Sequence, residues 1–421
     1  MRVEIKPSRA LGTVTAPPSK SAAHRALMIA ALGSGESRLC GIGDSADMAA
    51  TIGCLRALGA EIDIRGGTAR VRGIPAAARG SHGQDQGQDR SPLPCLNCLE
   101  SGSTLRFLLP ASLLFGGAVL RGTPRLMERG VGVYRDLLAP RGIEFNESTS
   151  GITVRGRLTA GDFALPGNVS SQFISGLLMA LPLLPPNKST DRCRIILTTP
   201  AESRAYIDMT VRALRDAGAE AERSGEEFII PCGQRYNPCN LTIEGDWSQA
   251  AFFFALGDGV NVAGLDPDSL QGDRAIVALL SDLRRGYTEA DLSDIPDLAP
   301  ILFTVAAMEG HGAHFEGTRR LAIKESRRAD VMAEELSKLG AKITASDNCV
   351  DILPAPLHSP AIPFSSHGDH RIAMALSVAA MRFGGVIDGA EAVGKSYPEF
   401  FRDLAAVGGD VAIHREAQDD A

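Results

Sequence analysis

Cations and small polar side chains gather in short stretches that each precede an apolar segment. Residues 17–27 contain a double proline, then Ser19, Lys20 and Ser21, with Arg25 about one turn later. Proline breaks a preceding helix and serine is a favoured N-cap, so we expect a helix to begin here. Cations in a first turn oppose the helix dipole, whereas the free N–H groups there bind anions. The stretch predicts either an exposed helix start with incidental charges or a site for an anionic substrate.

Two acids in the C-terminal half stand beside cations. Asp297 comes shortly before the apolar segment 301–308, and Glu325 lies between Lys324 and Arg328. As a helix N-cap Asp297 would be ordinary, whereas as a general base it needs a substrate hydroxyl within reach. Cations crowded into a first helical turn are unfavourable unless an anion binds there. We predict a helix that opens at about residue 324, and an acid–base pair formed by Asp297 and Glu325.

The same chemistry recurs at other expected helix starts. Ser170, Ser171 and Gln172 precede the apolar segment 174–184, either as a plain N-cap or as hydroxyl and amide ligands. In a repeated α/β architecture such N-termini can converge on one cleft. Its cations would be Lys20, Arg25, Arg125, Lys324, Arg328, Arg371 and Lys395. Such a site fits a substrate with several negative charges, for instance phosphates and carboxylates.

The composition bounds the class of protein. Of the 421 residues, 44% are hydrophobic and 22% are charged, which is ordinary for a globular protein. The net charge of −7 argues against a general nucleic-acid binder. The longest apolar run, 173–186, is too short to span a membrane. The N-terminus lacks the apolar region of a signal peptide, and the scattered cysteines form no disulfide framework. We expect a cytoplasmic protein of two or three domains.

Metal-ligand patterns are weak in this sequence. Cys95 and Cys98 form the one tight cysteine pair, and without a second pair or nearby histidines they favour loop thiols over a zinc site. His370 has no second histidine at ligand spacing. The Gly/Gln/Asp-rich residues 78–94 predict a surface loop, and the polar residues after 414 predict a frayed tail.

Five segments end in the same pattern, a leucine followed four residues later by glycine and then a strand-like start. Their glycines are Gly59, Gly142, Gly218, Gly340 and Gly408, and Gly286 closes a weaker sixth copy. Each copy predicts an amphipathic helix, a glycine at C′ and a strand, although many α/β helices end this way. Three copies in each half predict two similar α/β domains. The sixth copy is doubtful because residues 286–295 leave little room for strands.

Residues 389–396 match the P-loop pattern letter for letter. A P-loop normally opens its domain, and later strands supply the magnesium carboxylate. Here only 25 residues follow Ser396, and Pro398 stands where the helix should already run. An ATP-dependent kinase therefore stays an alternative, and Lys395 is better explained as part of the cationic site.

Eight short motifs occur in a fixed order between residues 17 and 400. They are Pro-Ser-Lys20-Ser21-x-x-x-Arg25-Ala-Leu, Ser-Gly102-Ser-Thr-Leu-Arg106, Pro-Arg125-x-x-Glu-Arg, Ser170-Ser171-Gln172-Phe, Ile-Pro-Asp297, Lys324-Glu325-Ser-x-Arg328, Asp369-His370-Arg371-x-Ala-Met and Lys395-Ser-Tyr-Pro. In this pattern the chain resembles the 3-phosphoshikimate 1-carboxyvinyltransferase, or EPSP synthase, family. One motif alone would be weak evidence, whereas eight in order are highly specific.

The resemblance implies a fold and a reaction. The fold would be two similar inverse α/β barrel domains, each of three βαβαββ units, with the active site in the interdomain cleft. One domain would span residues 19–242, and the other residues 1–18 and 243–421. The enzyme would transfer the enolpyruvyl (carboxyvinyl) group of phosphoenolpyruvate to the 5-hydroxyl of shikimate 3-phosphate and release phosphate, in the shikimate pathway of aromatic amino-acid biosynthesis. The resemblance implies no cofactor, no metal, no nucleic-acid or membrane partner, and a monomer.

The resemblance also assigns roles to residues. Shikimate 3-phosphate would be held by Lys20, Ser21, Arg25, Ser170, Ser171, Gln172, Ser203, Asp297 and Lys324. Phosphoenolpyruvate would be held by Lys20, Gly102, Arg125, Gln172, Arg328, Arg371 and Lys395. Asp297 would accept the proton of the 5-hydroxyl, and Glu325, assisted by Lys20, would protonate C3 of phosphoenolpyruvate.

The chain departs from the usual family pattern at three charged positions. Glu100 stands where the family often has Asn, Arg327 where it has Asp, and Arg320 where it has Asn. The segment before Asp297 is also short. A non-catalytic paralogue, which would bind shikimate 3-phosphate without releasing phosphate, therefore remains an alternative.

The sister enzyme that acts on UDP-N-acetylglucosamine is a further alternative. It shares the fold and phosphoenolpyruvate, and usually carries Lys-Asn where this chain has Lys20-Ser21. It also uses a reactive loop cysteine, for which Cys95 or Cys98 would have to stand.

Overall fold

The computed structural model describes residues 1–75 and 92–414. Most of the predicted loop at 78–94 and the predicted tail after 414 lie outside these residues. The chain separates into two compact units, one formed by Met1–Pro17 with Glu244–Ala421 and the other by Pro18–Ile243. Each unit has its own hydrophobic core.

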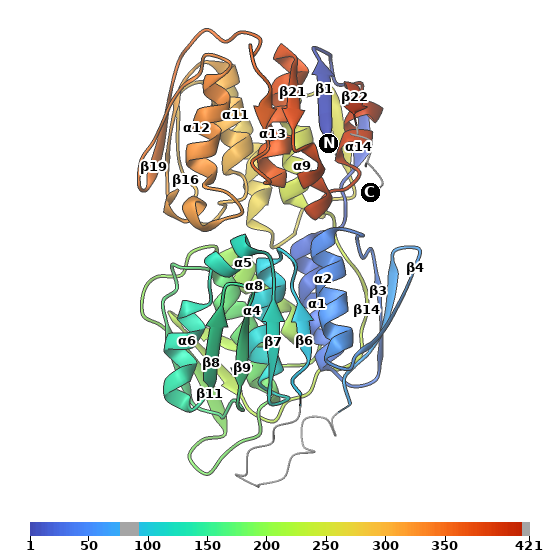
Figure 1. The fold of residues 1–421 in the computed structure, drawn as a ribbon, viewed down its shortest axis with the longest axis vertical. Coiled ribbons are helices and arrows are strands. Elements are labelled where there is room, and N and C mark those ends of the chain that lie inside the picture. The colour runs from blue at the N-terminus through green and yellow to red at the C-terminus, as the bar shows by residue number, and fades with distance from the viewer. Residues whose placement is uncertain (76–91, 415–421) are drawn as a thin grey trace. The chain divides into compact units, whose positions relative to one another are not determined.

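The continuous unit, residues 18–243, contains three four-stranded sheets of the same design. In strand order they are β14 (Asn240–Thr242), β3 (Glu36–Cys40), β5 (Thr68–Arg72) and β4 (Glu61–Arg65); β6 (Cys95–Asn97), β7 (Gly117–Arg121), β9 (Gly151–Arg155) and β8 (Glu144–Ser148); and β10 (Asp162–Leu165), β11 (Arg192–Leu197), β13 (Glu227–Pro231) and β12 (Glu222–Ser224). In each sheet the first pair is parallel and the other two pairs are antiparallel. Figure 1 shows β6, β7, β9 and β8 in this order. This is the βαβαββ arrangement that the resemblance implies.

Three helices of this unit are buried along almost their whole length: α1 (Lys20–Leu32), α4 (Gly102–Ser112) and α7 (Ser171–Ala180). Their sequences are apolar on nearly all sides, so they fit an interior rather than a surface position. Their partly exposed residues all lie at the helix starts, at Lys20–Ala22 in α1, Ser103 in α4 and Gln172 in α7. The outer helices are α2 (Ala46–Ala57), α5 (Pro124–Glu128), α6 (Gly132–Leu138) and α8 (Arg204–Asp216), with the 3₁₀ turns η1 (Ala139–Arg141) and η2 (Leu181–Leu183).

The other unit repeats the design with one shortened copy. Its complete sheets are β20 (Phe364–Ser365), β21 (Gly385–Asp388), β1 (Arg2–Lys6) and β22 (Asp410–His414), and β16 (Thr288–Asp291), β17 (Ala313–Glu316), β19 (Cys349–Leu353) and β18 (Lys342–Ala345). The third sheet has only β15 (Val260–Ala263) and β2 (Gly12–Thr15). Between Gly286 and Ile295 there is a single strand, β16, which belongs to the next sheet. The doubtful sixth copy is thus incomplete for the reason that the sequence suggested.

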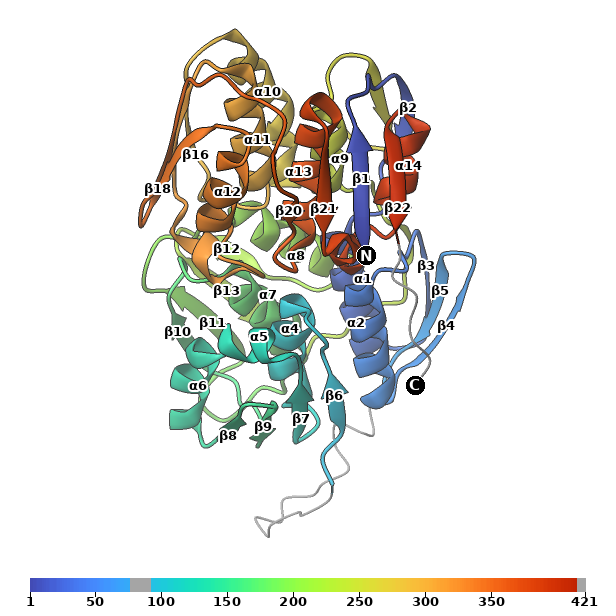
Figure 2. The ribbon, with the colours of Figure 1, turned by 45° about the horizontal axis from the view of Figure 1, so that its top comes forward.

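The helices of this unit again divide into inner and outer sets. The inner helices are α9 (Trp247–Phe254), α11 (Ala299–Glu309) and α13 (His370–Phe383), and most of their residues are buried. The outer helices are α10 (Ile276–Arg285), α12 (Arg328–Ser337) and α14 (Phe400–Ala406), with the 3₁₀ segments η3 (Gly272–Ala275), η4 (Arg319–Ile323) and η5 (Ala390–Lys395). Figure 2 shows β1 between β21 and β22 beside α13 and α14.

The glycines of the sequence repeat terminate helices as predicted. The five glycines of the strong copies have φ values from 80° to 104°, a conformation that glycine adopts without strain. Gly286 differs, because its φ of 170° is extended backbone. The five strong copies and the weak one are therefore distinct in backbone conformation as well as in sequence.

In the described part of the chain, no helix has both the length and the apolar character needed to cross a bilayer.

Candidate active site

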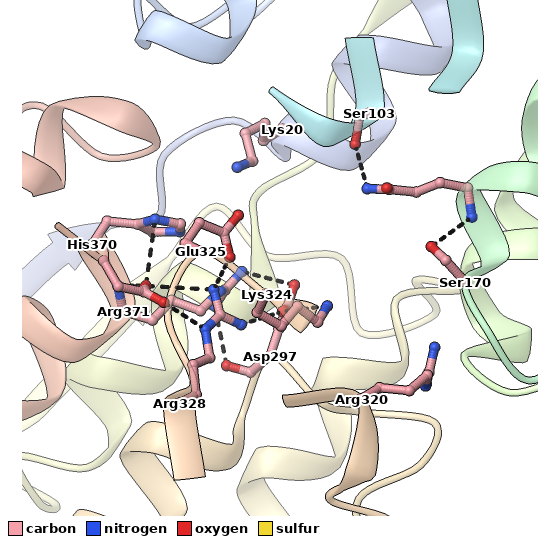
Figure 3. Close-up of polar contacts among 12 residues, drawn as sticks. Lys20, Ser103, Ser170, Asp297, Arg320, Lys324, Glu325, Arg328, His370 and Arg371 are labelled. Carbon is pink, nitrogen blue, oxygen red and sulfur yellow. Dashed lines mark hydrogen bonds and ion pairs between the residues drawn. The ribbon is translucent and has the colours of Figure 1, made fainter. Parts of the chain in front are cut away.

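Asp297 is the centre of a charged cluster in the discontinuous unit. Its Oδ1 accepts from Arg328 at 2.9 Å and from Lys324 at 3.3 Å, and its Oδ2 accepts from Arg371 at 3.0 Å. Arg371 also donates to the backbone carbonyl of Asp297 at 3.2 Å. Figure 3 shows these side chains pointing toward one another. Leu298, rather than Asp297, is the N-cap of α11. The interpretation of Asp297 as a plain N-cap is therefore wrong.

The cations determine the charge state of Asp297. Burial by itself would raise the pKa of this carboxyl, but the charges of Arg371, Lys324 and Arg328 outweigh it and place the pKa well below its usual range. Asp297 is therefore an ionised acceptor in the absence of substrate.

Arg328 connects the cluster to two further acids. Its side chain is 1% exposed, and it donates to Asp369 at 2.8 Å through Nε and to Glu325 at 2.7 Å through an η nitrogen. Burial lowers the pKa of an arginine, but the three neighbouring carboxylates raise the pKa of Arg328 above its ordinary value. Its guanidinium is thus a permanent charge that orients Asp297 and Glu325 together.

Lys324 and Lys395 flank the same acids. Burial is the main cause that lowers the pKa of Lys324 to about 8, opposed by the attraction of Asp297. Lys395 lies 3.5 Å from Glu325 and is 7% exposed. Lys324 and Glu325 precede α12, which begins only at Arg328, so the predicted helix start at 324 is four residues too early. The loop conformation lets both side chains reach the cluster.

Helix starts carry the polar groups of the continuous unit. Ser19 caps α1 by accepting from the Ala22 N–H at 3.4 Å, as the sequence predicts. Lys20, the first residue of α1, donates to Asp47 at 2.7 Å. An acid near the first turn of α1 offsets the unfavourable interaction of this lysine with the helix dipole.

Arg25 lies one turn further along α1 and is buried. It donates to the Ser21 carbonyl at 2.7 Å, the Tyr206 carbonyl at 2.6 Å and the Thr210 hydroxyl at 2.8 Å. Burial lowers its pKa to about 10. Arg25 therefore joins α1 to α8 in addition to any contact with a ligand.

A second polar group joins α4 to α7. Arg106 donates to the Gln172 carbonyl oxygen at 2.6 Å, and the Gln172 amide donates to Ser103 at 2.9 Å. Ser170 caps α7 by accepting from the Gln172 N–H at 3.3 Å. Ser103 and Ser170 are labelled in Figure 3. The plain N-cap role of Ser170 is confirmed, and the amide of Gln172 is fixed from both sides.

Gly102 and the remaining predicted residues lie at other helix starts. A side chain at Gly102 would place its Cβ 2.9 Å from the Arg129 guanidinium and 3.2 Å from that of Arg106. Arg125 lies near the start of α5, partly exposed, 3.4 Å from Glu128. Ser203 precedes α8 with a φ of 55°, a left-handed conformation that is uncommon outside glycine.

Comparisons with known proteins place the chain in one family. The chain matches the family model of EPSP synthase (3-phosphoshikimate 1-carboxyvinyltransferase) over residues 5–404. The 3-phosphoshikimate 1-carboxyvinyltransferases of Clostridium kluyveri and Clostridioides difficile are each 36% identical over 434 residues, covering 97% of this chain and 98% of each relative. The chain belongs to the EPSP synthase family.

Solved structures share the fold of this EPSP synthase family member. EPSP synthase from Acinetobacter baumannii aligns with a TM-score of 0.76 at 20% identity, covering 99% of this chain and 100% of that one. The enolpyruvyl transferase NikO from Streptomyces tendae aligns with a TM-score of 0.73 at 18% identity, covering 98% of each chain. The two-domain α/β fold predicted from the resemblance is confirmed.

The structure brings some of the predicted site residues into contact with one another. In the discontinuous unit one cluster contains Asp297, Lys324, Glu325, Arg328, Arg371 and Lys395. In the continuous unit the contacts pair Lys20 with Asp47, Arg25 with Ser21, and Gln172 with Ser170.

Three residues with clear structural roles in this EPSP synthase family member were given no role in the site by the sequence analysis. Asp369 is fully buried and binds Arg328, Arg106 orients Gln172, and Asp47 holds Lys20. Asp369 precedes a predicted helix, so a local pattern could have predicted that it caps α13. No local pattern could have predicted its pairing with Arg328, which lies 41 positions away.

The structure gives little support to two of the alternative functions, the P-loop kinase and the sister enzyme that uses a reactive cysteine. Residues 390–395 form the 3₁₀ segment η5 and α14 begins only at Phe400, which is not the loop-to-helix geometry of a P-loop. Cys98 is buried and its pKa is raised, mainly by its hydrogen-bonded neighbour Cys54, so it is a poor nucleophile. Cys95 begins the strand β6 rather than lying in a loop.

Proposed function

We propose that this chain transfers the enolpyruvyl group of phosphoenolpyruvate to the 5-hydroxyl of shikimate 3-phosphate and releases phosphate. Membership of the EPSP synthase family is the observation that carries this proposal. The clustering of an ionised acid, a second acid and four cations supports it, because both substrates are polyanions and the reaction moves protons. The two compact units would be the two enolpyruvyl-transferase domains, and we expect a monomer in the cytoplasm.

Substrate binding would neutralise part of the cationic cluster. Lys324 would hold the phosphate of shikimate 3-phosphate together with Ser170, Ser171 and Ser203, and Lys20, Ser21, Arg25 and Gln172 would hold the rest of the ring substituents. Arg328, Arg371 and Lys395, with Arg125, Gly102 and Gln172, would hold phosphoenolpyruvate. Charge-assisted hydrogen bonds of this kind are the strong ones in proteins. Arginine suits carboxylate and phosphate because its donors form a planar fork.

Asp297 would accept the proton of the 5-hydroxyl as that oxygen attacks C2 of phosphoenolpyruvate. Before substrate binds, three cations keep the pKa of Asp297 low, which makes it a weak base. Anionic substrate groups on Lys324 and Arg371 would offset those charges and raise the pKa of Asp297 toward a useful range. Substrate binding itself would thus activate the base.

Glu325 would deliver a proton to C3 of phosphoenolpyruvate while the C2–O bond forms, with Lys20 assisting. The tetrahedral intermediate would then lose a proton from C3 and expel phosphate, so the vinyl double bond is restored. Arg328 at 2.7 Å and Lys395 at 3.5 Å from Glu325 would stabilise the carboxylate and the leaving phosphate.

The decisive experiment measures phosphate release by the full-length chain in EDTA with both substrates. Release that requires both substrates, and that falls at least a hundredfold in Asp297→Ala, supports the transferase. Asp388→Ala is the matched control, because Asp388 forms an exposed ion pair with Arg2 in the same unit. Calorimetric binding of shikimate 3-phosphate without any release would instead identify a binding paralogue. In a separate assay with magnesium in place of EDTA, turnover of ATP would support the P-loop alternative.

A further inference from the structure

Glu335 is a buried carboxylate on α12, seven residues beyond Arg328. It has no exposed surface. Its oxygens accept from Lys338 Nζ at 2.8 and 2.9 Å and from the Ser365 N–H at 2.8 Å, and one lies 2.9 Å from His367 Nε2. Residues seven apart lie on the same face of a helix, so Arg328 and Glu335 face the same neighbouring segment.

That segment is the turn before α13, and it is held in a strained conformation. His367 has a φ of 49°, the left-handed region that a side chain with a Cβ enters only at an energetic cost. The contact with Glu335 and a hydrogen bond from its own N–H to the Ser365 hydroxyl at 3.2 Å hold His367 there. Strain of this kind persists only where the surroundings impose it.

The strained turn leads directly into the charged cluster. The Asp369 N–H donates to the Ser366 carbonyl at 2.9 Å, and Asp369 then binds Arg328. Two residues later, Arg371 donates to Asp297. Helix α12 therefore holds this turn at two points, through Arg328 at its start and through Glu335 two turns later.

A metal site is a poor explanation of the acids in this region. Ligand atoms of Glu334, Glu335 and His367 lie within 4.8 Å of one another. However, the ammonium of Lys338 donates to both oxygens of Glu335, so a cation already occupies the carboxylate. A second cation there would be repelled.

We propose that Glu335 and His367 form a positioning pair that sets Asp369 and Arg371 for the handling of phosphoenolpyruvate. This inference rests on the proposed function for its kinetic consequences. Neither residue touches substrate in this proposal. The pair acts by holding the turn 365–368 in a conformation that the sequence around His367 does not favour by itself.

Two substitutions of His367, one by alanine and one by glycine, separate the loss of its contact with Glu335 from the strain of its left-handed backbone. His367→Ala loses the imidazole but still requires a left-handed backbone, so the turn should relax. His367→Gly loses the same contact without that requirement, so the turn should persist. We expect kcat/KM for phosphoenolpyruvate to fall about tenfold in His367→Ala and about twofold in His367→Gly. We also expect Glu335→Gln to resemble His367→Ala, and the exposed neighbour variant Glu334→Gln to match the parent enzyme.

Hydrogen exchange provides a readout that does not depend on catalysis. The amides of residues 365–371 should exchange faster in His367→Ala and Glu335→Gln, but not in His367→Gly or Glu334→Gln. A lower melting temperature with unchanged exchange and unchanged phosphoenolpyruvate kinetics would mean a merely structural role and would overturn the inference. If the parent enzyme releases no phosphate, the proposed function fails, while the exchange pattern still decides the inference.

Discussion

At the scale of single residues, the ionised state of Asp297 depends on its neighbours rather than on its own chemistry. Arg328, Lys324 and Arg371 approach it within 3.3 Å and keep it charged although it is largely shielded from water. The same proximity acts on the cations, because burial lowers the pKa of Lys324 while Asp297 opposes the shift. The protonation state of each group is thus a property of the cluster.

If Lys324 holds shikimate 3-phosphate as proposed, we expect the binding of this substrate to depend on pH. Its pKa of about 8 means that it loses its charge at a lower pH than an exposed lysine does. We expect KM for shikimate 3-phosphate to be constant below about pH 7 and to rise toward tenfold per unit above about pH 8.5. Steady-state kinetics across this range measure the effect. In Lys324→Arg the guanidinium stays protonated, so the rise should vanish, whereas a flat profile in the parent enzyme would contradict the argument.

Asp369 neutralises a fully buried guanidinium. Replacing it by Asn keeps an acceptor for the Arg371 N–H that it caps at 2.9 Å, but removes the charge that faces Arg328. Breaking a buried pair by removing one partner typically lowers the free energy of unfolding by about 3–5 kcal/mol. We expect a loss of about 3 kcal/mol in Asp369→Asn by urea denaturation.

The control for this measurement is Asp388→Asn. Asp388 pairs with Arg2 at 2.6 Å, but both side chains are about half exposed, so the expected loss is below about 1 kcal/mol. If both variants lost the same free energy of unfolding, the buried pair of Arg328 and Asp369 would be no more stabilising than the exposed pair of Arg2 and Asp388, and the argument would fail.

At the scale of elements, helix N-termini present the polar residues of both units. Apolar helices such as α4, α7 and α13 are buried along most of their length, and the predicted site residues on them, Gly102, Ser171, Gln172 and Arg371, occupy their first two positions. The N–H groups at these positions lack helical partners, and they attract serine caps, aspartate caps and anions for the same reason. We therefore expect a capping residue at these positions to serve the fold and the proposed site together.

Ser170 tests this double role. It caps α7 by accepting from the Gln172 N–H, and its loss in Ser170→Ala should lower the free energy of unfolding by about 1 kcal/mol. The same variant should raise KM for shikimate 3-phosphate several-fold. Asp246 caps α9 by accepting from the Gln249 N–H at 3.0 Å and is not among the predicted site residues. Asp246→Ala should therefore show a comparable stability loss with KM unchanged, and an equal rise in KM would refute a specific role for Ser170.

At the scale of the whole molecule, one unit is built from both ends of the chain. Strand β1 lies between β21 and β22, with Arg2 opposite both Asp388 and His414. Val3 and Ile5 on this strand are almost completely buried. The unit therefore lacks a central strand until the first seventeen residues join residues 244–421.

This connectivity predicts the behaviour of fragments. Residues 244–421 alone should not fold cooperatively, because three strand pairings, of β1 with β21 and β22 and of β2 with β15, and a buried strand face are lost. Residues 244–414 joined through a short Gly/Ser linker to residues 1–17 should fold, because β1 and β22 are antiparallel neighbours and their ends meet. Circular dichroism and thermal unfolding distinguish the two. A cooperative transition in the unlinked fragment would show that β1 is dispensable for folding.

The sequence by itself determined the family, the fold class and many helix ends, because these depend on short-range chemistry. Ser19 caps α1, Ser170 caps α7, and the repeat glycines take the left-handed conformation that ends a helix. Each of these involves residues within a few positions of one another, so a local pattern is sufficient. The predicted substrate contacts remain predictions.

Only the tertiary structure decided which charges meet. Arg328 is buried among acids up to 41 positions away, Lys324 lies in a loop rather than in a helix, and the P-loop pattern at residues 389–396 forms a 3₁₀ segment. Burial and pairing of charges arise when distant segments pack together, and packing removes the water that would otherwise screen them. No local pattern contains that information, which is why the sequence assigned no role to Asp369 and only the fold placed it beside Arg328.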